Sequence, residues 1–255
     1  MTALGGRVAL VTGASNGTGV DIARALAAAG ARVAVHYRAD RAAAEAVAAA
    51  IRGAGGAAEV FAADVARADD VRRLMAEVQA RLGNPVVVVN NAGPFNGAAF
   101  CELAEPDWDH VMNANLKAVY LTAQLTAAGM RRAGWGRIVN IGATSGLVRS
   151  HGVYGVAKAA LLALTEALAL ELAPVITVNA VVPSQIASAR TDRLAAYKAA
   201  AIAGTPLGRL VTQAEIGRMV VRLCSSEFDF VTGQAIVMDG GRTIPRFPRL
   251  DISTE

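Results

Sequence analysis

The sequence predicts a doubly wound α/β fold in a single domain, with helices covering both faces of a parallel seven-stranded sheet. Short runs rich in valine and isoleucine alternate with alanine- and leucine-rich segments of helical periodicity. Parallel strands need such helical connections, which then cover both faces of the sheet. No change of composition and no Pro- or Gly-rich linker divides the 255 residues. We therefore expect one domain over residues 1–255.

Seven runs are the predicted strands, because each is short, apolar and rich in β-branched residues. They are Arg7–Thr12, Arg32–Tyr37, Ala58–Asp64, Pro85–Asn91, Arg137–Gly142, Ile176–Val182 and Ala235–Gly241. The stretches between them are predicted helices. The interval 184–210 is mostly irregular with one short helical piece, which is typical of a flap over a binding site.

Composition argues against several classes of function. The chain has a formal charge of +4, but its arginines are scattered among acids, so no nucleic-acid groove is indicated. We find no apolar run of the roughly 18 residues that a membrane span needs, and no secretory signal at the start. We therefore expect a cytoplasmic protein without a membrane partner. Cys101 and Cys224 lack disulfide or zinc spacing, so no metal site is predicted.

A glycine turn, TGASNGTG at Thr12–Gly19, follows the first strand and leads into a helix. Gly13, Gly17 and Gly19 let the backbone turn sharply and bring amide groups at the helix N-terminus close to a pyrophosphate. A tight connection between a strand and a helix also needs glycines. The turn by itself therefore favours a dinucleotide site but leaves a purely structural role open.

The end of the second strand indicates which dinucleotide binds. Proteins that select NAD carry a carboxylate there for the ribose 2′-hydroxyl. This chain has Tyr37 followed by Arg38, and a guanidinium pairs with a phosphate. The prediction is NADP(H), although arginine is common everywhere in this chain.

Tyr154 and Lys158 are four residues apart in a long apolar segment, so a helix places them on one face. Lysine is rare here, with three lysines among 25 cationic residues, so Lys158 stands out. A phenol has a pKa near 10, and a nearby ammonium favours the phenolate. We expect Lys158 to lower the pKa of Tyr154.

These motifs, with NNAG at Asn90–Gly93, YGVAK at Tyr154–Lys158 and VTGQAIVMDGG near the end, resemble the short-chain dehydrogenase/reductase family. The resemblance covers Gly6 to Arg242 and is nearest to ketoacyl-carrier-protein reductases and polyketide ketoreductases. It implies a Rossmann-type fold. It also implies an oxidoreductase that reduces a ketone, or oxidises the alcohol, with NADP(H) rather than NAD(H).

The resemblance also implies roles for individual residues. Tyr154 would exchange the proton of the substrate oxygen, Lys158 would hold the nicotinamide ribose, and Asn115 would bind a water in the proton relay. Asp64 and Val65 would contact the adenine, and Pro183, Ile186 and Ser188 the carboxamide. The residues predicted to bind the cofactor are Gly13, Ser15, Asn16, Gly17, Thr18, Gly19, Tyr37, Arg38, Asp64, Val65, Asn91, Ala92, Gly93, Tyr154, Lys158, Pro183, Ile186 and Ser188.

The chain departs from the family at the serine that binds the substrate carbonyl, because Ala143 stands there. Losing such a donor typically costs about 2.7 to 4 kcal/mol of transition-state stabilisation. Three explanations are open. Thr144, Ser145 or a substrate hydroxyl would replace the missing donor, or the substrate is activated differently. In the third, the protein is a non-redox descendant, either a cofactor-binding protein or a lyase-like biosynthetic enzyme.

Residues around the predicted site are expected to shape a pocket for a small carbonyl substrate. By position these are Phe95, Asn96, Leu147, His151 and the flap, although a loop histidine is often simply solvated. The resemblance also suggests a homotetramer, or a homodimer, built through long helices. The nearly polar-free stretch Ala159–Leu172 suits such burial, but it equally suits packing on the sheet.

Overall fold

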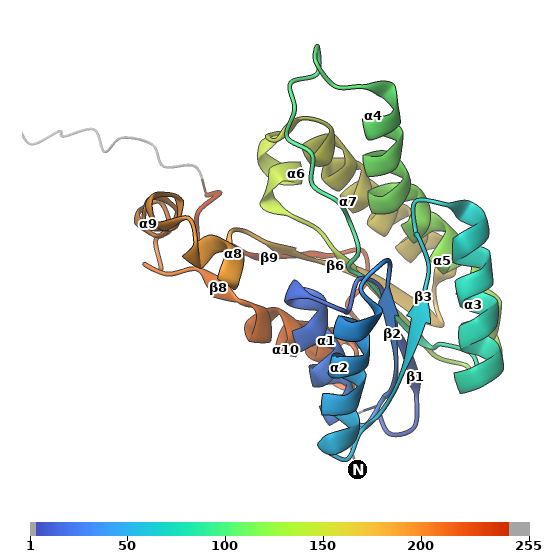
Figure 1. The fold of residues 1–255 in the computed structure, drawn as a ribbon. Coiled ribbons are helices and arrows are strands. Elements are labelled where there is room, and N and C mark those ends of the chain that lie inside the picture. Colours follow the sequence, from blue (N-terminus) through green and yellow to red (C-terminus); the bar gives the residue numbers. More distant parts are fainter. Residues whose placement is uncertain (1–3, 245–255) are drawn as a thin grey trace, which may run out of the picture.

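The computed structural model describes residues 4–244, which form a central sheet between two layers of helices (Figure 1). All seven strands are parallel, in the order β3-β2-β1-β4-β5-β6-β9. They are β1 (Val8–Val11), β2 (Arg32–Tyr37), β3 (Ala57–Ala62), β4 (Val87–Asn90), β5 (Gly136–Ile141), β6 (Ile176–Pro183) and β9 (Ala235–Met238). The predicted fold class and all seven predicted strands are confirmed.

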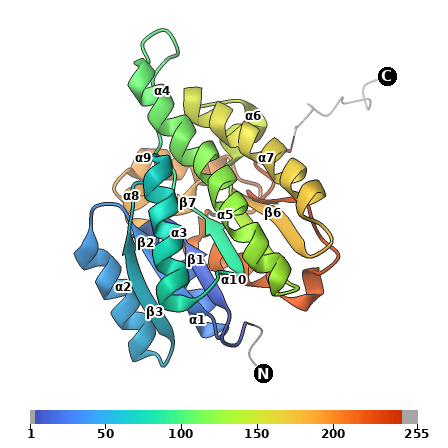
Figure 2. The ribbon, with the colours of Figure 1, turned by 90° about the vertical axis from the view of Figure 1, so that its right-hand side faces the viewer.

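Three helices cover each face of the sheet. On one face lie α1 (Gly17–Ala28), α2 (Arg41–Gly53) and α10 (Gln213–Leu223). On the other lie α3 (Ala68–Leu82), α5 (Ala118–Arg132) and α7 (Gly152–Leu172), which run side by side in Figure 2. The remaining helices are α4 (Glu105–Met112), α6 (Thr144–Val148), α8 (Ala189–Asp192) and α9 (Ala195–Ala203), with a π-helical turn η1 (Asn113–Lys117) and a 3-10 turn η2 (Ser226–Phe228).

The strands read as continuous apolar runs because both of their faces are buried. In β1, Ala9 and Val11 pack into the core on the side of α1, whereas Val8 and Leu10 pack on the side of α3. Successive side chains of a strand point to opposite faces. Each residue of β1 therefore contributes to one of two cores, and this fixes the middle of the sheet.

The strand order reverses between β1 and β4, since β1 leads outward to β2 while β4 leads outward to β5. In open α/β sheets, ligands bind outside the carboxyl ends of the strands at such a point. The segments that follow β1 and β4 are the glycine turn and Asn91–Gly93. The topology thus brings together two motifs that lie far apart in the sequence.

The flap is more regular than the sequence suggested. Besides α8 and α9 it contains β7 (Ile186–Ala187), which pairs in parallel with β8 (Val211–Thr212) in a separate two-stranded sheet. Strands of two residues are too short to give a periodic signal, so they were not predicted. Figure 1 shows this unit beside the main sheet.

The expectation that no segment resembles a membrane span was wrong for α7, which is long and apolar enough by length and composition. Its most apolar window has a mean hydropathy of 1.6. Leu168, Ala169 and Leu172 of this helix are buried in the core next to β6. Core helices pass the same test, so the hydropathy of α7 is accounted for by its packing. The predicted domain limits include residues 1–3 and 245–255, which lie outside the described residues.

Candidate active site

The glycine turn and the segment after β4 are held together by hydrogen bonds. The Asn91 side chain donates from Nδ2 to the carbonyl oxygens of Thr12, at 2.9 Å, and Gly13, at 3.0 Å. The Thr12 hydroxyl in turn accepts from the backbone amides of Asn91 and Ala92. Asn91 and Ala92 therefore lie beside the glycine turn, as a shared binding role requires, and they fix its shape.

The start of α1 fits a dinucleotide pyrophosphate. Gly13 and Gly17 have positive φ angles of 64° and 55°, which favour glycine. A Cβ on Gly19 would overlap the carbonyl oxygen of Gly13, so only glycine allows the two backbones to approach this closely. Asn16 makes no side-chain cap and the first turn carries no acid, so the helix N-terminus is open to an anion. Ser15 and Thr18 are half-buried along the same turn.

His36 also shapes this turn, although no sequence pattern indicated a role for it. The amide of Gly13 donates to its Nδ1 at 2.9 Å, and its Nε2 lies 3.0 Å from the carbonyl oxygen of Ala63. A carbonyl only accepts, so Nε2 carries the proton and the ring is neutral. Burial lowers the pKa of His36 to about 4. His36 thus joins β1, β2 and β3 beneath the cofactor cleft as a neutral bridge.

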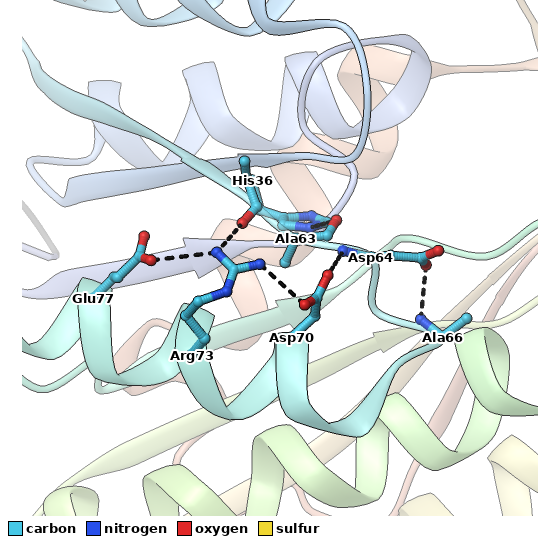
Figure 3. Close-up of polar contacts among 8 residues, drawn as sticks. His36, Ala63, Asp64, Ala66, Asp70, Arg73 and Glu77 are labelled. Carbon is cyan, nitrogen blue, oxygen red and sulfur yellow. Dashed lines mark hydrogen bonds and ion pairs between the residues drawn. The ribbon is translucent and has the colours of Figure 1, made fainter.

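The predicted adenosine end is held by a network at the start of α3 (Figure 3). The backbone amide of Asp64 donates to Asp70, and the Asp64 carboxylate accepts from the amide of Ala66. Arg73 pairs with both Asp70 and Glu77. The hydrogen bonds of Asp70 to the Asp64 amide and to Arg73 lower its pKa. Asp64 and the buried Val65 are therefore held in place at the end of β3.

Tyr37 and Arg38 lie at the end of β2 but differ in exposure. The Tyr37 side chain is buried in the core, whereas Arg38 is exposed. Nη1 of Arg38 is 3.5 Å from Nε2 of His110 on α4, and no acidic side chain among residues 4–244 forms an ion pair with it. Arg38 therefore keeps its charge available at the position predicted for a 2′-phosphate, and Tyr37 serves mainly as core.

Tyr154 and Lys158 lie in the first two turns of α7, on one face of the helix. Nζ of Lys158 is 5.6 Å from the centroid of the Tyr154 ring and donates to the carbonyl oxygen of Ile141, the last residue of β5, at 2.8 Å. The side chain of Lys158 is buried, and this is the one hydrogen bond that its Nζ makes among residues 4–244. The helix thus presents a phenol and an ammonium together beside the carboxyl end of β5.

The prediction that Lys158 lowers the pKa of Tyr154 was wrong. Burial raises the pKa of Tyr154 to about 12 and lowers the pKa of Lys158 to about 8. Both shifts have the same cause, because loss of water disfavours the charged form of each group. The ammonium is directed at Ile141 rather than at the phenol, so desolvation outweighs the attraction between the two groups.

Asn115 lies in the π-helical turn η1, which packs against α7. Its Nδ2 donates to the carbonyl oxygens of Pro94 and Val111, both at 3.0 Å. Its Oδ1 is buried, has no partner among the described residues, and occupies the place where a Cβ on Gly93 would be. Gly93 is therefore required by Asn115, and a buried acceptor without a partner suits an ordered water.

The serine position is occupied by Ala143, which directly precedes α6 and carries no hydroxyl. Thr144 and Ser145 are both buried in α6. The hydroxyl of Ser145 lies 2.8 Å from Nδ1 of His151. Thus a hydroxyl and an imidazole meet in the turn before Tyr154, although neither occupies the expected position.

Phe95 joins these groups to the phenol. Its ring makes edge contacts with Tyr154, at 5.1 Å between centroids, and with His151, at 5.7 Å. The guanidinium of Arg190 on α8 lies 5.9 Å from the same ring. Phe95 and His151 therefore border the predicted site as expected. Asn96 instead accepts from the amide of Ala98 as a turn residue, and Leu147 is half-buried in α6.

The predicted carboxamide segment leaves β6 at Pro183. Ile186 lies in β7, and Ser188 caps α8 through a capping box with Thr191. Gln185, which was not predicted as a site residue, has a buried Oε1 without a partner among residues 4–244. Ser188 therefore has a structural task of its own, and Gln185 offers an acceptor close to the end of β6.

A cavity of about 510 Å³ lies between the end of the flap, α10 and β9. Its lining residues are Pro206, Leu207, Arg209, Val211, Glu215, Val237, Met238, Asp239, Gly240 and Gly241. None of the predicted catalytic side chains lines it. The candidate site is therefore defined by the Tyr154 cluster and the glycine turn rather than by this cavity.

Comparisons with known proteins agree with this arrangement. A family model described as enoyl-(acyl carrier protein) reductase matches residues 13–243. Nodulation protein G of a Rhizobium species is 40% identical over 247 residues, covering 94% of this chain and 98% of that protein. The 3-oxoacyl-[acyl-carrier-protein] reductase FabG of Pseudomonas aeruginosa is 37% identical over 242 residues, covering 93% and 98%.

A solved structure has the same fold over nearly the whole length. The gluconate 5-dehydrogenase of Burkholderia cenocepacia, in complex with NADP and tartrate, superposes with a TM-score of 0.88. The two chains are 33% identical, with 96% of this chain and 98% of that chain covered.

Proposed function

Because this chain belongs to the short-chain dehydrogenase/reductase family of oxidoreductases, which act on CH–OH and C=O groups, we propose that it reduces a ketone with NADPH. The observation that carries the proposal is the Tyr154–Lys158 pair, with the phenol partly buried and the lysine buried, beside the carboxyl end of β5. The glycine turn follows β1 at the same carboxyl ends of the parallel strands. Tyr154 is the proposed proton donor.

The residues of the glycine turn and Lys158 would hold the cofactor at two points. The open N-terminus of α1 would receive the pyrophosphate, and Lys158 would contact the nicotinamide ribose. The buried Oε1 of Gln185, which has no partner among residues 4–244, would accept a hydrogen bond from the carboxamide. When bound, the nicotinamide supplies a hydride to the carbonyl carbon. The chain contributes the geometry of this transfer and the proton.

Tyr154 donates its phenolic proton to the carbonyl oxygen as the hydride reaches the carbon, so that the ketone becomes an alcohol and the tyrosine a phenolate. A pKa of about 12 keeps this phenol protonated at neutral pH, as a proton donor requires. The alkoxide that would otherwise form is more basic than a phenolate, so the transfer is downhill. The ammonium of Lys158 then stabilises the phenolate until a water held by Asn115 helps to return the proton.

The preference for NADPH rests on Arg38. Its guanidinium is exposed at the end of β2 and has no carboxylate partner among residues 4–244. A guanidinium can pair with the 2′-phosphate of NADPH, whereas NADH offers it no such anion. We expect Arg38→Ala to weaken NADPH binding by about tenfold, because a charge-assisted hydrogen bond is worth about 1.5 to 3 kcal/mol, and to leave NADH binding unchanged.

The proposed assembly is a homotetramer, or a homodimer, in which α5 and α7 form contacts between copies. Tyr120 and Leu125 of α5 and Leu170 of α7 are exposed, and Leu170 is 85% exposed. Exposed apolar side chains on neighbouring helices suit a symmetric interface. Light scattering during gel filtration measures the mass directly, and a monomer would contradict the proposal. The cytoplasmic location stays a prediction.

The test of the activity follows NADPH absorbance with a panel of ketones. The panel includes acetoacetyl-coenzyme A, because a relative is a 3-oxoacyl-[acyl-carrier-protein] reductase, and 5-keto-gluconate, because a structural neighbour is a gluconate 5-dehydrogenase. We expect oxidation of NADPH with at least one ketone, and slower oxidation of NADH. If NADPH binds but no ketone is reduced, the proposal fails and the non-redox alternative raised by Ala143 is favoured.

A further inference from the structure

We propose that Ser145 supplies the carbonyl-binding hydroxyl that Ala143 lacks, and that His151 is the positioning residue that leaves the Ser145 proton available for the substrate. The proposal rests on the proposed ketone reduction. It is carried by the hydrogen bond between the two side chains, by the packing of α6 on α7, and by the left-handed turn that joins these helices.

The short helix α6 packs closely on α7, the helix that carries Tyr154 and Lys158. A Cβ on Gly146 would lie 2.7 Å from the backbone nitrogen of Ala159 and from the carbonyl carbon of Lys158. The backbones of α6 and α7 therefore touch at Lys158. Ser145, the residue before Gly146, is held at this contact and is only 8% exposed. The backbone of Ser145 is thus held against α7, the helix that carries Tyr154 and Lys158.

The turn from α6 to α7 has a strained backbone. Arg149 and His151 have φ angles of 54° and 67°, in the left-handed region that costs non-glycine residues roughly 1–2 kcal/mol each. A Cβ on Gly152 would lie 2.7 Å from the carbonyl oxygen of Ala98, so the segment after β4 presses on the turn. Strain of this kind persists where the surrounding structure enforces it, often at functional sites.

The His151 ring is directed at the hydroxyls of two serines. The strained turn brings Nδ1 to 2.8 Å from the hydroxyl of Ser145 and 2.9 Å from that of Ser150. The ring also contacts Phe95, which contacts Tyr154. The imidazole and the phenol therefore border the same aromatic ring, and the Ser145 hydroxyl lies one hydrogen bond away from that imidazole.

The hydrogen-bond roles explain what His151 does. If Nδ1 accepts, the Ser145 proton points at the imidazole and cannot reach a substrate carbonyl. If Nδ1 carries a proton and donates to Ser145, the hydroxyl proton of Ser145 is left for the substrate. A donor whose direction is fixed before reaction stabilises the developing oxyanion best. Thr144 has no side-chain hydrogen bond among residues 4–244, so nothing fixes the direction of its hydroxyl.

The test begins with single hydroxyl deletions, assayed with NADPH and acetoacetyl-coenzyme A or 5-keto-gluconate, whichever the wild type reduces faster. Ser145→Ala is expected to lower kcat by about a hundredfold to a thousandfold, as for the loss of one oxyanion donor. Thr144→Val and Ser150→Ala remove neighbouring hydroxyls and are expected to stay within about fivefold of wild type. A loss in Thr144→Val as large as that expected for Ser145→Ala would overturn the proposal.

The role of His151 is tested by a matched pair. Asparagine and aspartate have nearly the same shape and both tolerate left-handed backbone. His151→Asn retains an N–H that can donate to Ser145, so kcat should stay within about tenfold of wild type, whereas the acceptor-only His151→Asp should lose as much as Ser145→Ala. Equal rates in the two variants would contradict the proposal.

Rescue separates a chemical effect from a structural one. Adding Ala143→Ser to Ser145→Ala, and to His151→Asp, should restore at least about tenfold in kcat, because the hydroxyl returns to the position that Ala143 left. No rescue in either background would overturn the proposal. The affinity for NADPH should be unchanged in every variant. A wild type that reduces no ketone would refute the proposed function, whereas an active wild type with an equally active Ser145→Ala would refute only this inference.

Discussion

The two halves of the candidate site are built differently. At the carboxyl ends of β1 and β4, the cofactor half is held by hydrogen bonds between backbone and side chains. Beyond β5, the substrate half consists of the short helix α6 and the strained turn that follows it. Three hydrogen bonds join Asn91 and His36 to the backbone of Thr12 and Gly13. In two more, the Thr12 hydroxyl accepts from the amides of Asn91 and Ala92. On the other side, the His151 ring contacts the hydroxyls of Ser145 and Ser150 and the ring of Phe95. The cofactor half thus has one determined shape, and the substrate half has room to change.

This difference has a physical origin. Every dinucleotide presents the same pyrophosphate, so one arrangement of backbone amides serves all of them. Substrates vary, and the residues that meet them sit on loops carried by a rigid scaffold. In this chain the substrate half contains both left-handed non-glycine residues of the described chain and a replaced serine. The replaced serine thus lies where the chemistry of the substrate is decided.

A large effect is expected at Lys158, the group that both halves use. Removing one preorganised group that stabilises developing negative charge typically costs about 2.7 to 4 kcal/mol, or roughly a hundredfold or more in rate. Lys158→Met should therefore lower kcat at least about a hundredfold, and more if the ribose contact is lost as well. The exposed Lys117→Met is the matched control and should leave kcat unchanged. A Lys158→Met variant within tenfold of wild type would show that the ammonium has no part in catalysis.

The pKa of Lys158 also predicts the pH profile of the reduction. Burial lowers this pKa to about 8, so the ammonium loses its proton as the pH rises through that value. The profile of kcat/KM reports ionisations of the free enzyme. We expect kcat/KM for ketone reduction to fall above about pH 8, while Tyr154, with a pKa of about 12, stays protonated. A profile that is flat from pH 7 to 10 would contradict the assignment.

The second effect tests the cofactor half through His36. Its pKa is about 4 in the folded protein and 6.5 for an unperturbed histidine, so the unfolded chain binds the proton first as the pH falls. Stability contributed by neutral His36 is therefore complete above pH 6.5 and is lost between pH 6.5 and 4. The loss amounts to about 3 kcal/mol. Urea unfolding at several pH values measures it, and His36→Gln, which does not titrate, should lack this part of the slope.

How much of this could be seen in the sequence depends on the range of the interactions. The seven strands and the Tyr154–Lys158 pair follow from local patterns, and all of these were predicted. The bridge made by His36 joins residues that lie 23 and 27 positions apart, so no local pattern marks it. The direction in which the pKa of Tyr154 shifts was predicted wrongly, because desolvation depends on burial in three dimensions. The Ser145–His151 contact needs a left-handed histidine, which no spacing indicates.

Two glycines in opposite environments, Gly19 and Gly53, give a further comparison through their effects on NADPH binding. A Cβ on Gly19 would overlap the carbonyl oxygen of Gly13, and overpacking of this kind costs about 1–3 kcal/mol. Gly19→Ala should weaken NADPH binding by roughly five- to 150-fold. Gly53 of α2 has open space around its Cβ position, so Gly53→Ala should leave binding unchanged and stabilise the fold by about 0.5–1 kcal/mol. Equal effects of the two variants on NADPH titrations would contradict the requirement for glycine at position 19.

The central claim is that the partly buried phenol of Tyr154 delivers the proton, and Tyr154→Phe tests it most directly. This change removes one hydroxyl and keeps the ring that packs against Phe95. We predict that NADPH affinity stays within about threefold, while ketone reduction falls by about a hundredfold to ten-thousandfold, the usual contribution of a general acid. Tyr120→Phe, which removes an exposed hydroxyl from α5, should keep the wild-type rate. A Tyr154→Phe variant that reduces the ketone at a rate close to wild type would contradict the account.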